Sequence, residues 1–366
     1  MSMVRPTVCL SLRWLLALAP GAVAQPDSQG QFKAEFLRLC DVASAEINNP
    51  ARQTPKPVPF YIDSYAVRAL CVAHDMTGTE LYLETCKRWT DRMIEYQGGM
   101  TPKGAYYMNY GRKPGENEGE WFVADSSSIA LAILATSARC GGPEKQKYLD
   151  SVEQFASLVA ENYIGEAGGV TDGFWSKYAG EWWCSSGIFG SVAFLMHRAT
   201  GSEQYREIGR NAINWLNHLD LSKVKFGYWK TDAPMVVMYV LEAYSAGMPY
   251  IEPGTQLYQE TLDKVNHLLA WMSENQGTSG KWDYNKWGGS KLGGLPFHMY
   301  VLSAYVPQRR QQIRDAADAE LRHIASVLAK DNPPKQTPLA VFAMLSYAER
   351  LSPGAIYRQS AATRPS

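Results

Sequence analysis

Two aspartates stand out because each lies in an apolar surround and is followed directly by serine. Asp63 lies in the segment Phe-Tyr-Ile-Asp-Ser-Tyr that begins at residue 60, and Asp125 lies in Trp-Phe-Val-Ala-Asp-Ser-Ser-Ser, which begins at residue 121. Apolar neighbours exclude water from a carboxyl and raise its pKa, which suits a proton donor near neutral pH. Two such groups across a pocket are what the cleavage of a glycosidic bond requires. The alternative is structural, because aspartate also stabilises the first turn of any helix.

Aromatic residues gather in a second recurring pattern. A glycine followed closely by aromatic residues occurs at 104–107, 173–175, 227–229 and 280–282. Aromatic faces stack on the apolar faces of sugar rings, whereas in the structural alternative they only fill space. Seven of the 11 tryptophans lie in the loops that lead into the predicted interior helices, namely Trp121, Trp175, Trp182, Trp183, Trp229, Trp282 and Trp287. The aromatic residues predicted to contact a substrate are Tyr61, Tyr107, Trp121, Trp175, Trp183, Trp229 and Trp287.

Three polar residues are further candidates for substrate contacts. Arg112 lies in a loop and could bind a sugar carboxylate, although a solvated loop cation would look the same in sequence. Asp232 precedes Pro234 by two residues, a position that favours a helix cap. His298 is the histidine nearest to the start of a predicted interior helix, although a lone histidine is more often structural.

A glycine followed by tyrosine recurs and predicts where amphipathic helices begin. The pattern Gly-x-x-x-Tyr starts at Gly78, Gly201 and Gly254, with a looser copy at Gly142. After each tyrosine, apolar residues recur three and four positions apart, the spacing of one helix face. These segments therefore predict helices with one buried face and one face in water.

Helices of another kind lie between them. The segments 129–135, 188–196, 235–241 and 338–345 are apolar nearly all round and too short to cross a bilayer, so we expect them inside the protein. Twelve helices alternate between the two kinds, near 31–48, 60–76, 79–97, 122–139, 144–163, 184–199, 203–219, 234–247, 255–274, 295–305, 309–329 and 338–350. The alternation predicts an all-α (α/α)6 toroid, with an inner ring inside an outer ring, and an open solenoid is the alternative. Parallel inner helices would bring their N-termini to one face, which we call the mouth.

The chain is predicted to be one exported domain. Residues 1–24 have the basic start, apolar run and small-residue cleavage site of a signal peptide, which predicts a secreted or periplasmic protein. Residues 25–351 show no linker and are expected to form the toroid, with a flexible tail over 352–366. The 36 basic and 36 acidic residues balance, so nucleic acid is not an expected partner. No later segment predicts a membrane span.

The cysteines do not predict a metal site. Five cysteines follow the predicted cleavage point, so at least one is free or pairs with another chain. Cys71 and Cys86 flank a turn and could face each other, but most are expected to be small buried hydrophobes. Cys184 with His298 is too small a set for zinc, and the sequence predicts no cofactor. It leaves oligomeric state open.

These residues resemble those of the six-hairpin, or (α/α)6-toroid, carbohydrate enzymes, most closely the unsaturated glucuronyl and galacturonyl hydrolases. Ile62-Asp63-Ser64 and Ala124-Asp125-Ser126 are similar to the two catalytic aspartates of that family. The stretch from Trp182 to Ser191 is similar to its tryptophan-containing segment. The resemblance implies hydrolysis of oligosaccharides that contain a 4,5-unsaturated uronic acid. Asp125 would then donate a proton and activate water, Asp63 would hold the sugar, and Trp183 would stack on its ring.

Two other functions remain open at this stage. A polysaccharide lyase on the same fold would use His298, Tyr300 or Tyr61 as the base and Arg112 beside the uronate. A non-catalytic glycan-binding or scaffold protein would keep the aromatic mouth without proton-active carboxyls. An isoprenoid cyclase would need an Asp-rich motif that the chain lacks.

Overall fold

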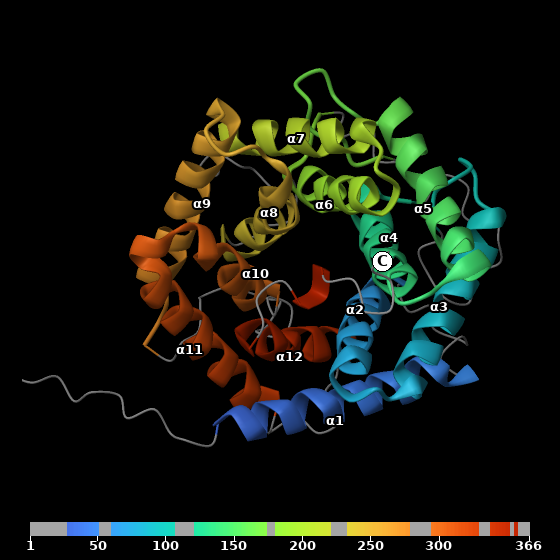
Figure 1. Ribbon diagram of the computed structural model, residues 1–366, viewed down its shortest axis with the longest axis horizontal. Helices are drawn as coiled ribbons and strands as arrows, with labels where there is room; N and C mark the ends of the chain where they lie inside the picture. The colour runs from blue at the N-terminus through green and yellow to red at the C-terminus, as the bar shows by residue number, and fades with distance from the viewer. Residues whose placement is uncertain are drawn as a thin grey trace, which may run out of the picture.

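The computed structural model describes residues 28–50, 60–106, 121–173, 180–220, 233–278, 294–328, 337–351 and 355–357. Over these residues the chain forms twelve α-helices in two concentric rings (Figure 1). The inner helices are α2 (Phe60–Thr77), α4 (Val123–Ser137), α6 (Trp183–Thr200), α8 (Ala233–Gly247), α10 (Gly294–Leu302) and α12 (Thr337–Leu351). The outer helices are α1 (Ser28–Asn48), α3 (Glu80–Gly98), α5 (Gly142–Asn162), α7 (Glu203–His218), α9 (Gln256–Glu274) and α11 (Arg310–Leu328).

The inner ring is closed. Each inner helix packs against the next one along the chain, and α12 returns to pack against α2 (Figure 1). An open solenoid would leave its first and last helices apart, so the predicted (α/α)6 toroid is confirmed. The predicted helix ranges match the observed ones to within a few residues, except that a short 3-10 turn, η6 (Ser303–Tyr305), follows α10.

The recurring glycines allow the chain to turn from an inner helix into an outer one. Gly78, Gly201 and Gly254 have φ values of 69°, 75° and 86°. Glycine adopts this left-handed conformation at little cost because it has no Cβ atom. In any other residue the Cβ atom would clash with the backbone there. The repeat therefore marks the turns at the far end of the ring from the mouth.

The tyrosine of the repeat connects neighbouring outer helices. The Tyr82 hydroxyl on α3 donates to Asp41 Oδ1 on α1 at 2.7 Å, and the Tyr205 hydroxyl on α7 donates to Glu153 Oε1 on α5 at 2.7 Å. Both rings are buried while their hydroxyls reach a carboxylate at the edge of the outer ring. The role of the repeat is thus structural.

The inner helices approach one another closely where glycine is present. A Cβ atom added to Gly187 on α6 would lie 2.2 Å from the carbonyl oxygen of Tyr239 on α8. A Cβ atom on Gly190, one turn further along α6, would meet Ala212 and Ala243 only at an ordinary 3.4 Å. The contact between α6 and α8 therefore depends on Gly187 in particular.

We expect Gly187→Ala to destabilise the protein by about 1–3 kcal/mol, because the clash is with backbone that cannot rotate away. Gly190→Ala is the matched control in the same helix. It should be neutral or stabilising by up to about 1 kcal/mol, because alanine favours a helix over glycine. Urea unfolding followed by circular dichroism measures both, and equal effects of the two substitutions would contradict this account of the contact.

The five cysteines among the described residues, at positions 40, 71, 86, 140 and 184, are buried and form no disulfide with one another. The sulfur atoms of Cys71 and Cys86 lie 3.7 Å apart, so these residues face each other as expected. No described helix is both long and apolar enough to cross a membrane.

A short C-terminal turn, η8 (Ala355–Tyr357), lies at the centre of the ring (Figure 1). Ile356 is buried, and the Tyr357 hydroxyl donates to Glu242 Oε1 on α8 at 3.2 Å. The sequence predicted a flexible tail from residue 352, but apolar and hydrogen-bonding contacts hold this turn inside the toroid.

Candidate active site at the mouth of the ring

The first two turns of four inner helices bring a carboxyl, a thiol and two phenols together at the mouth. Asp125 comes from α4, Tyr61 from α2, Cys184 from α6 and Tyr239 from α8. Burial, with the nearby Asp125 charge as a further cause, raises the pKa of the Tyr61 hydroxyl and of the Cys184 thiol. The pKa of Tyr239 is also raised well above 10 by burial. All three groups therefore keep their protons near neutral pH and can donate hydrogen bonds.

Asp125 has the properties of a proton-transferring group. It lies in the first turn of α4 and is half-buried. Burial raises the pKa of its carboxyl from 3.8 to about 7. The positive end of the helix dipole favours the ionised form at this position, yet desolvation outweighs it. Near neutral pH the carboxyl is thus divided between its acidic and basic forms, as general acid–base catalysis requires.

The same pKa makes Asp125 a destabilising group at high pH. Between pH 3.8 and about 7 the folded protein keeps a proton that the unfolded chain has lost, so stability falls as pH rises. We expect Asp125→Asn to stabilise the protein relative to the natural chain by about 2–4 kcal/mol more at pH 8 than at pH 4. Urea unfolding at the two pH values measures this. The exposed Asp91→Asn substitution is the control, and a pH-independent effect of Asp125→Asn would contradict the burial argument.

Asp63 lies in different surroundings. It is fully buried in the first turn of α2. The sequence predicted two carboxyls that face a pocket. Of these two, only Asp125 is partly accessible to solvent. Asp63 cannot contact a substrate in this arrangement without movement of its neighbours.

A second titratable carboxyl at the mouth belongs to Asp172. The Val123 amide at the start of α4 donates to the Asp172 carbonyl oxygen at 3.1 Å, which fixes this residue beside α4. Asp172 is 2% exposed, and burial raises the pKa of its carboxyl to about 6. Its Oδ2 atom has no hydrogen-bond partner within the described part of the chain. Asp172 was not among the residues predicted from the sequence, although it directly precedes the Gly-x-aromatic segment at residue 173.

The described tryptophans are more buried than predicted. Trp121 is 1% exposed and packs edge-on against Tyr163, with ring centres 5.0 Å apart. Trp183 is 4% exposed and packs on Tyr239 at 5.6 Å, while Trp182, at 5.7 Å from Trp183, is partly exposed. Trp121 and Trp183 thus fill the space beneath the mouth, whereas Tyr61, Trp182 and Tyr239 retain partial exposure there.

His298 lies in the interior and not at the mouth. It is fully buried, and its Nδ1 atom is 2.9 Å from the Ser245 hydroxyl. Its Nε2 atom is 3.3 Å from Glu242, which also pairs with Arg68 at 2.6 Å. The expected polar contact with a substrate is therefore replaced by a contact between inner helices, because α10 turns this side chain toward α8.

Six predicted contact residues lie outside the described residues, namely Tyr107, Arg112, Trp175, Trp229, Asp232 and Trp287. Within the described residues, no three histidine, cysteine or acidic side chains form a cluster that could hold a metal ion.

Comparisons with known proteins show the fold. No family model matches the chain, and no curated protein matches its sequence. Among solved structures, a cellobiose 2-epimerase from Bacillus thermoamylovorans is 12% identical, with a TM-score of 0.60 over 82% of this chain and 87% of that one. A glycosyl hydrolase family 88 protein from Bacteroides vulgatus is 10% identical, with a TM-score of 0.60 over 88% and 99%. Dfg5 from Chaetomium thermophilum, in complex with glucosamine, is 12% identical, with a TM-score of 0.60 over 93% and 98%. These proteins share the toroid fold.

Proposed function

We propose that this protein is a carbohydrate-active enzyme in which Asp125 transfers the proton. The observation that carries the proposal is a half-buried carboxyl at the mouth with a pKa of about 7. A buried structural aspartate would be paired with a cation, and a simple helix cap would lie in water with a low pKa. Neither describes Asp125, whose carboxyl is desolvated by burial and whose charge acts on the neighbouring Tyr61, Cys184 and Tyr239.

A carbohydrate is the substrate class that the surroundings favour. Tyr61 and Trp182 offer partly exposed aromatic faces, which bind the apolar faces of sugar rings, and protonated phenols donate to sugar hydroxyls. The similar structures include an epimerase of cellobiose, a glycosyl hydrolase and a protein bound to glucosamine. The resemblance of the Asp63 and Asp125 segments to unsaturated uronyl hydrolases favours oligosaccharides that end in a uronic acid.

The proposed reaction is the hydration of a 4,5-unsaturated uronic acid. Protonated Asp125 donates its proton to C4 of the C4=C5 double bond, and the water oxygen adds to C5. The resulting carboxylate accepts a proton from this attacking water. Asp172 is the second carboxyl with a raised pKa at this end of the ring and can hold or move a proton beside α4. Asp63, being buried, would act by positioning its neighbours and not by touching the sugar.

The alternative lyase reaction finds less support among the described residues. Its candidate bases were His298, Tyr300 and Tyr61. His298 and Tyr300 are buried in the interior, and burial raises the pKa of Tyr61, so that it keeps its proton. A base that abstracts the C5 proton needs the opposite properties, namely access to the sugar and a pKa near the working pH.

Absorbance of the conjugated alkene distinguishes the functions. We expect the purified chain to remove this absorbance from unsaturated uronyl disaccharides over time. Appearance of the absorbance from intact uronic-acid polysaccharides would instead establish a lyase. Binding of these glycans with no change in either assay would support the non-catalytic glycan-binding alternative.

We further propose that the chain is exported with residues 1–24 removed. Uronic-acid polysaccharides and their fragments are extracellular material, so an exported enzyme would meet its substrate directly. Mass spectrometry of protein recovered from the periplasm or medium tests the cleavage site after Ala24.

A further inference from the structure

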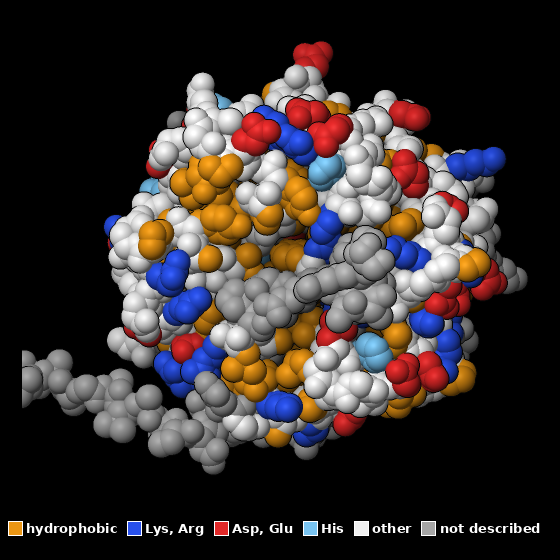
Figure 2. Space-filling view, in the orientation of Figure 1, with side chains coloured by type: hydrophobic (Ala, Val, Ile, Leu, Met, Phe, Trp, Pro, Cys, Tyr) orange, Lys and Arg blue, Asp and Glu red, His pale blue; other side chains and the backbone are white. Residues whose placement is uncertain are grey.

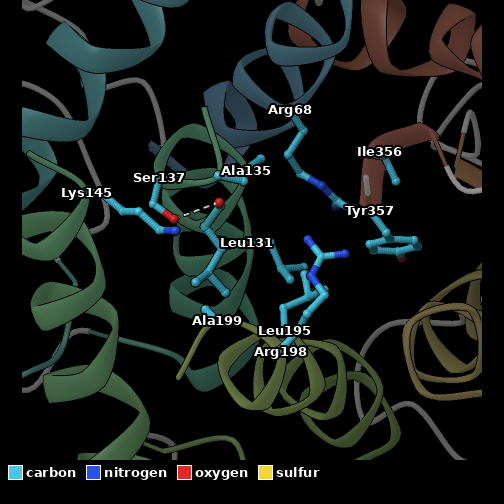
Figure 3. A pocket seen from close by; sticks show the side chains of 12 residues that line it. Arg68, Leu131, Ala135, Ser137, Lys145, Leu195, Arg198, Ala199, Ile356 and Tyr357 are labelled. Carbon is cyan, nitrogen blue, oxygen red and sulfur yellow. Dashed lines mark hydrogen bonds between the residues drawn. The ribbon is translucent and has the colours of Figure 1, made fainter. Parts of the chain in front are cut away.

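A cavity at the far end of the ring has no part in the proposed reaction. It lies between the last turns of α4, the last turn of α6 and η8, and it has a volume of about 30 Å³. Because the inner helices run parallel, the C-terminal ends of α4 and α6 lie opposite the mouth. The side chains that line the cavity include Arg68, Lys145, Arg198 and Tyr357 (Figure 3).

The charges around this cavity do not balance. Three cations line it, namely Arg68, Lys145 and Arg198. The nearest carboxylate to Arg68 is Glu242, whose Oε1 accepts from Arg68 at 2.6 Å and from the Tyr357 hydroxyl at 3.2 Å. Arg68 is therefore neutralised, whereas Lys145 and Arg198 have no acidic partner and no side-chain hydrogen bond among the described residues.

Arg198 is the cation that a ligand would contact most directly. It is half-buried in the last turn of α6. Figure 3 shows its side chain and that of Arg68 pointing toward the space in front of Tyr357. Burial lowers the pKa of Arg198, and the charge of Arg139 adds to this effect. A half-buried guanidinium without an acceptor is costly, and an anion would remove that cost.

Lys145 adds positive potential to the cavity, and the helix dipole does not account for the presence of a cation at its position. Arg198, at a helix C-terminus, interacts favourably with the dipole of α6. Lys145 lies in the first turn of α5, where the dipole disfavours a cation. Figure 2 shows basic side chains close to the ring axis on this face of the molecule.

We propose that this cavity binds a small doubly charged oxyanion, phosphate or sulfate, with Arg198 as its main ligand. A dianion neutralises the two unpaired cations, and the planar guanidinium presents paired N–H groups that match the oxygens of such an ion. A volume of about 30 Å³ excludes a sugar but accepts a small ion that remains partly open to solvent. The bound ion joins Arg198 on α6 to Lys145 on α5 and stabilises this end of the toroid.

Calorimetric titration of the full chain with inorganic phosphate, and separately with sulfate, tests the site in buffers balanced with chloride. We expect one ion to bind per chain and Arg198→Gln to weaken binding by about tenfold or more. Lys147→Gln is the control on the same helix as Lys145, because Lys147 points outward and pairs with Asp91 at 2.8 Å. It should leave the affinity within about twofold, since a distant exposed charge contributes little.

Two results overturn the proposal. One is the absence of binding by both ions, and the other is equal affinity of Arg198→Gln and the natural chain. If Arg198→Gln does not fold, Arg198→Lys serves in its place, because it keeps the charge but loses the guanidinium fork. Binding that is weaker by about threefold or more then supports the site, and unchanged binding refutes it. Turnover at the mouth is not involved in either measurement, so the outcome is independent of the proposed function.

Discussion

Under the proposed function, we expect Asp125→Asn to lower kcat on an unsaturated uronyl disaccharide by a factor of about 10²–10⁴, the usual contribution of a general acid–base group. Asparagine keeps the size of the side chain but cannot release a proton. The natural chain should lose activity as pH rises through about 7, because the acid form of Asp125 is then lost. Initial rates of loss of alkene absorbance, measured from pH 5 to 9, give both results.

Substrate affinity distinguishes a loss of catalysis in Asp125→Asn from a loss of binding. Asp125→Asn should retain its affinity for the disaccharide within about threefold, since uniform binding contacts remain and only the transition-state interaction is lost. Quenching of tryptophan fluorescence reports that affinity, because Trp182 and Trp183 lie at the mouth. The exposed substitution Asp91→Asn should have no effect on either quantity. A kcat for Asp125→Asn equal to that of the natural chain would rule out the proposed role of Asp125.

Removing the charge of Glu242 should cause the largest loss of stability, about 3–5 kcal/mol for Glu242→Gln. The Glu242 side chain contacts Arg68 at 2.6 Å, His298 at 3.3 Å and Tyr357 at 3.2 Å, and it thereby joins α8 to α2, α10 and η8. The Arg68 side chain is 3% exposed, so the substitution leaves an uncompensated charge inside the ring. Thermal and urea unfolding measure the loss.

The control for this substitution is Glu252→Gln, which removes an exposed pair with Arg206 at 3.3 Å and should cost less than about 1 kcal/mol. The stability of the natural and substituted chains at low pH provides an independent check. Burial acts to raise the pKa of Glu242, but Arg68 and His298 together hold it well below its usual range. The stability that Glu242 contributes is therefore present above its ordinary pKa and is lost as pH falls, so the difference between natural and substituted chains should shrink in acid. A difference that does not change with pH would contradict the ion-pair account.

The toroid could be predicted because its signals are local in sequence. Apolar residues that recur three and four positions apart identify the outer helices, and segments such as 129–135 that are apolar all round identify the inner ones. The glycine of each repeat takes up a left-handed conformation where an inner helix gives way to an outer one. Each of these features depends on residues within one or two turns of each other, so a single sequence is sufficient to read them.

The candidate site was only partly accessible to the same reasoning. The sequence placed Asp63 and Asp125 at equivalent points of two inner helices, and both do lie in first turns. Whether a first-turn carboxyl faces the mouth or the interior depends on how far its helix is rotated, which neighbouring helices decide. This rotation leaves Asp125 half-exposed and buries Asp63 and His298.

The alternating helices and the aspartate at the start of α4 could be predicted from residue order, because helix periodicity and first-turn position are local properties. Closure of the ring, and which groups share an environment, depend on tertiary contacts such as that of α12 with α2. Arg68 and Glu242 are 174 positions apart in sequence yet form the central buried ion pair. Asp172 lies beside α4 through the hydrogen bond from the Val123 amide and the bridge between Phe122 and Gly173. Likewise, the pKa of Asp125 and the unbalanced charge around Arg198 arise from residues on several helices. Such properties depend on distances through space, which cannot be read directly from the order of residues along the chain.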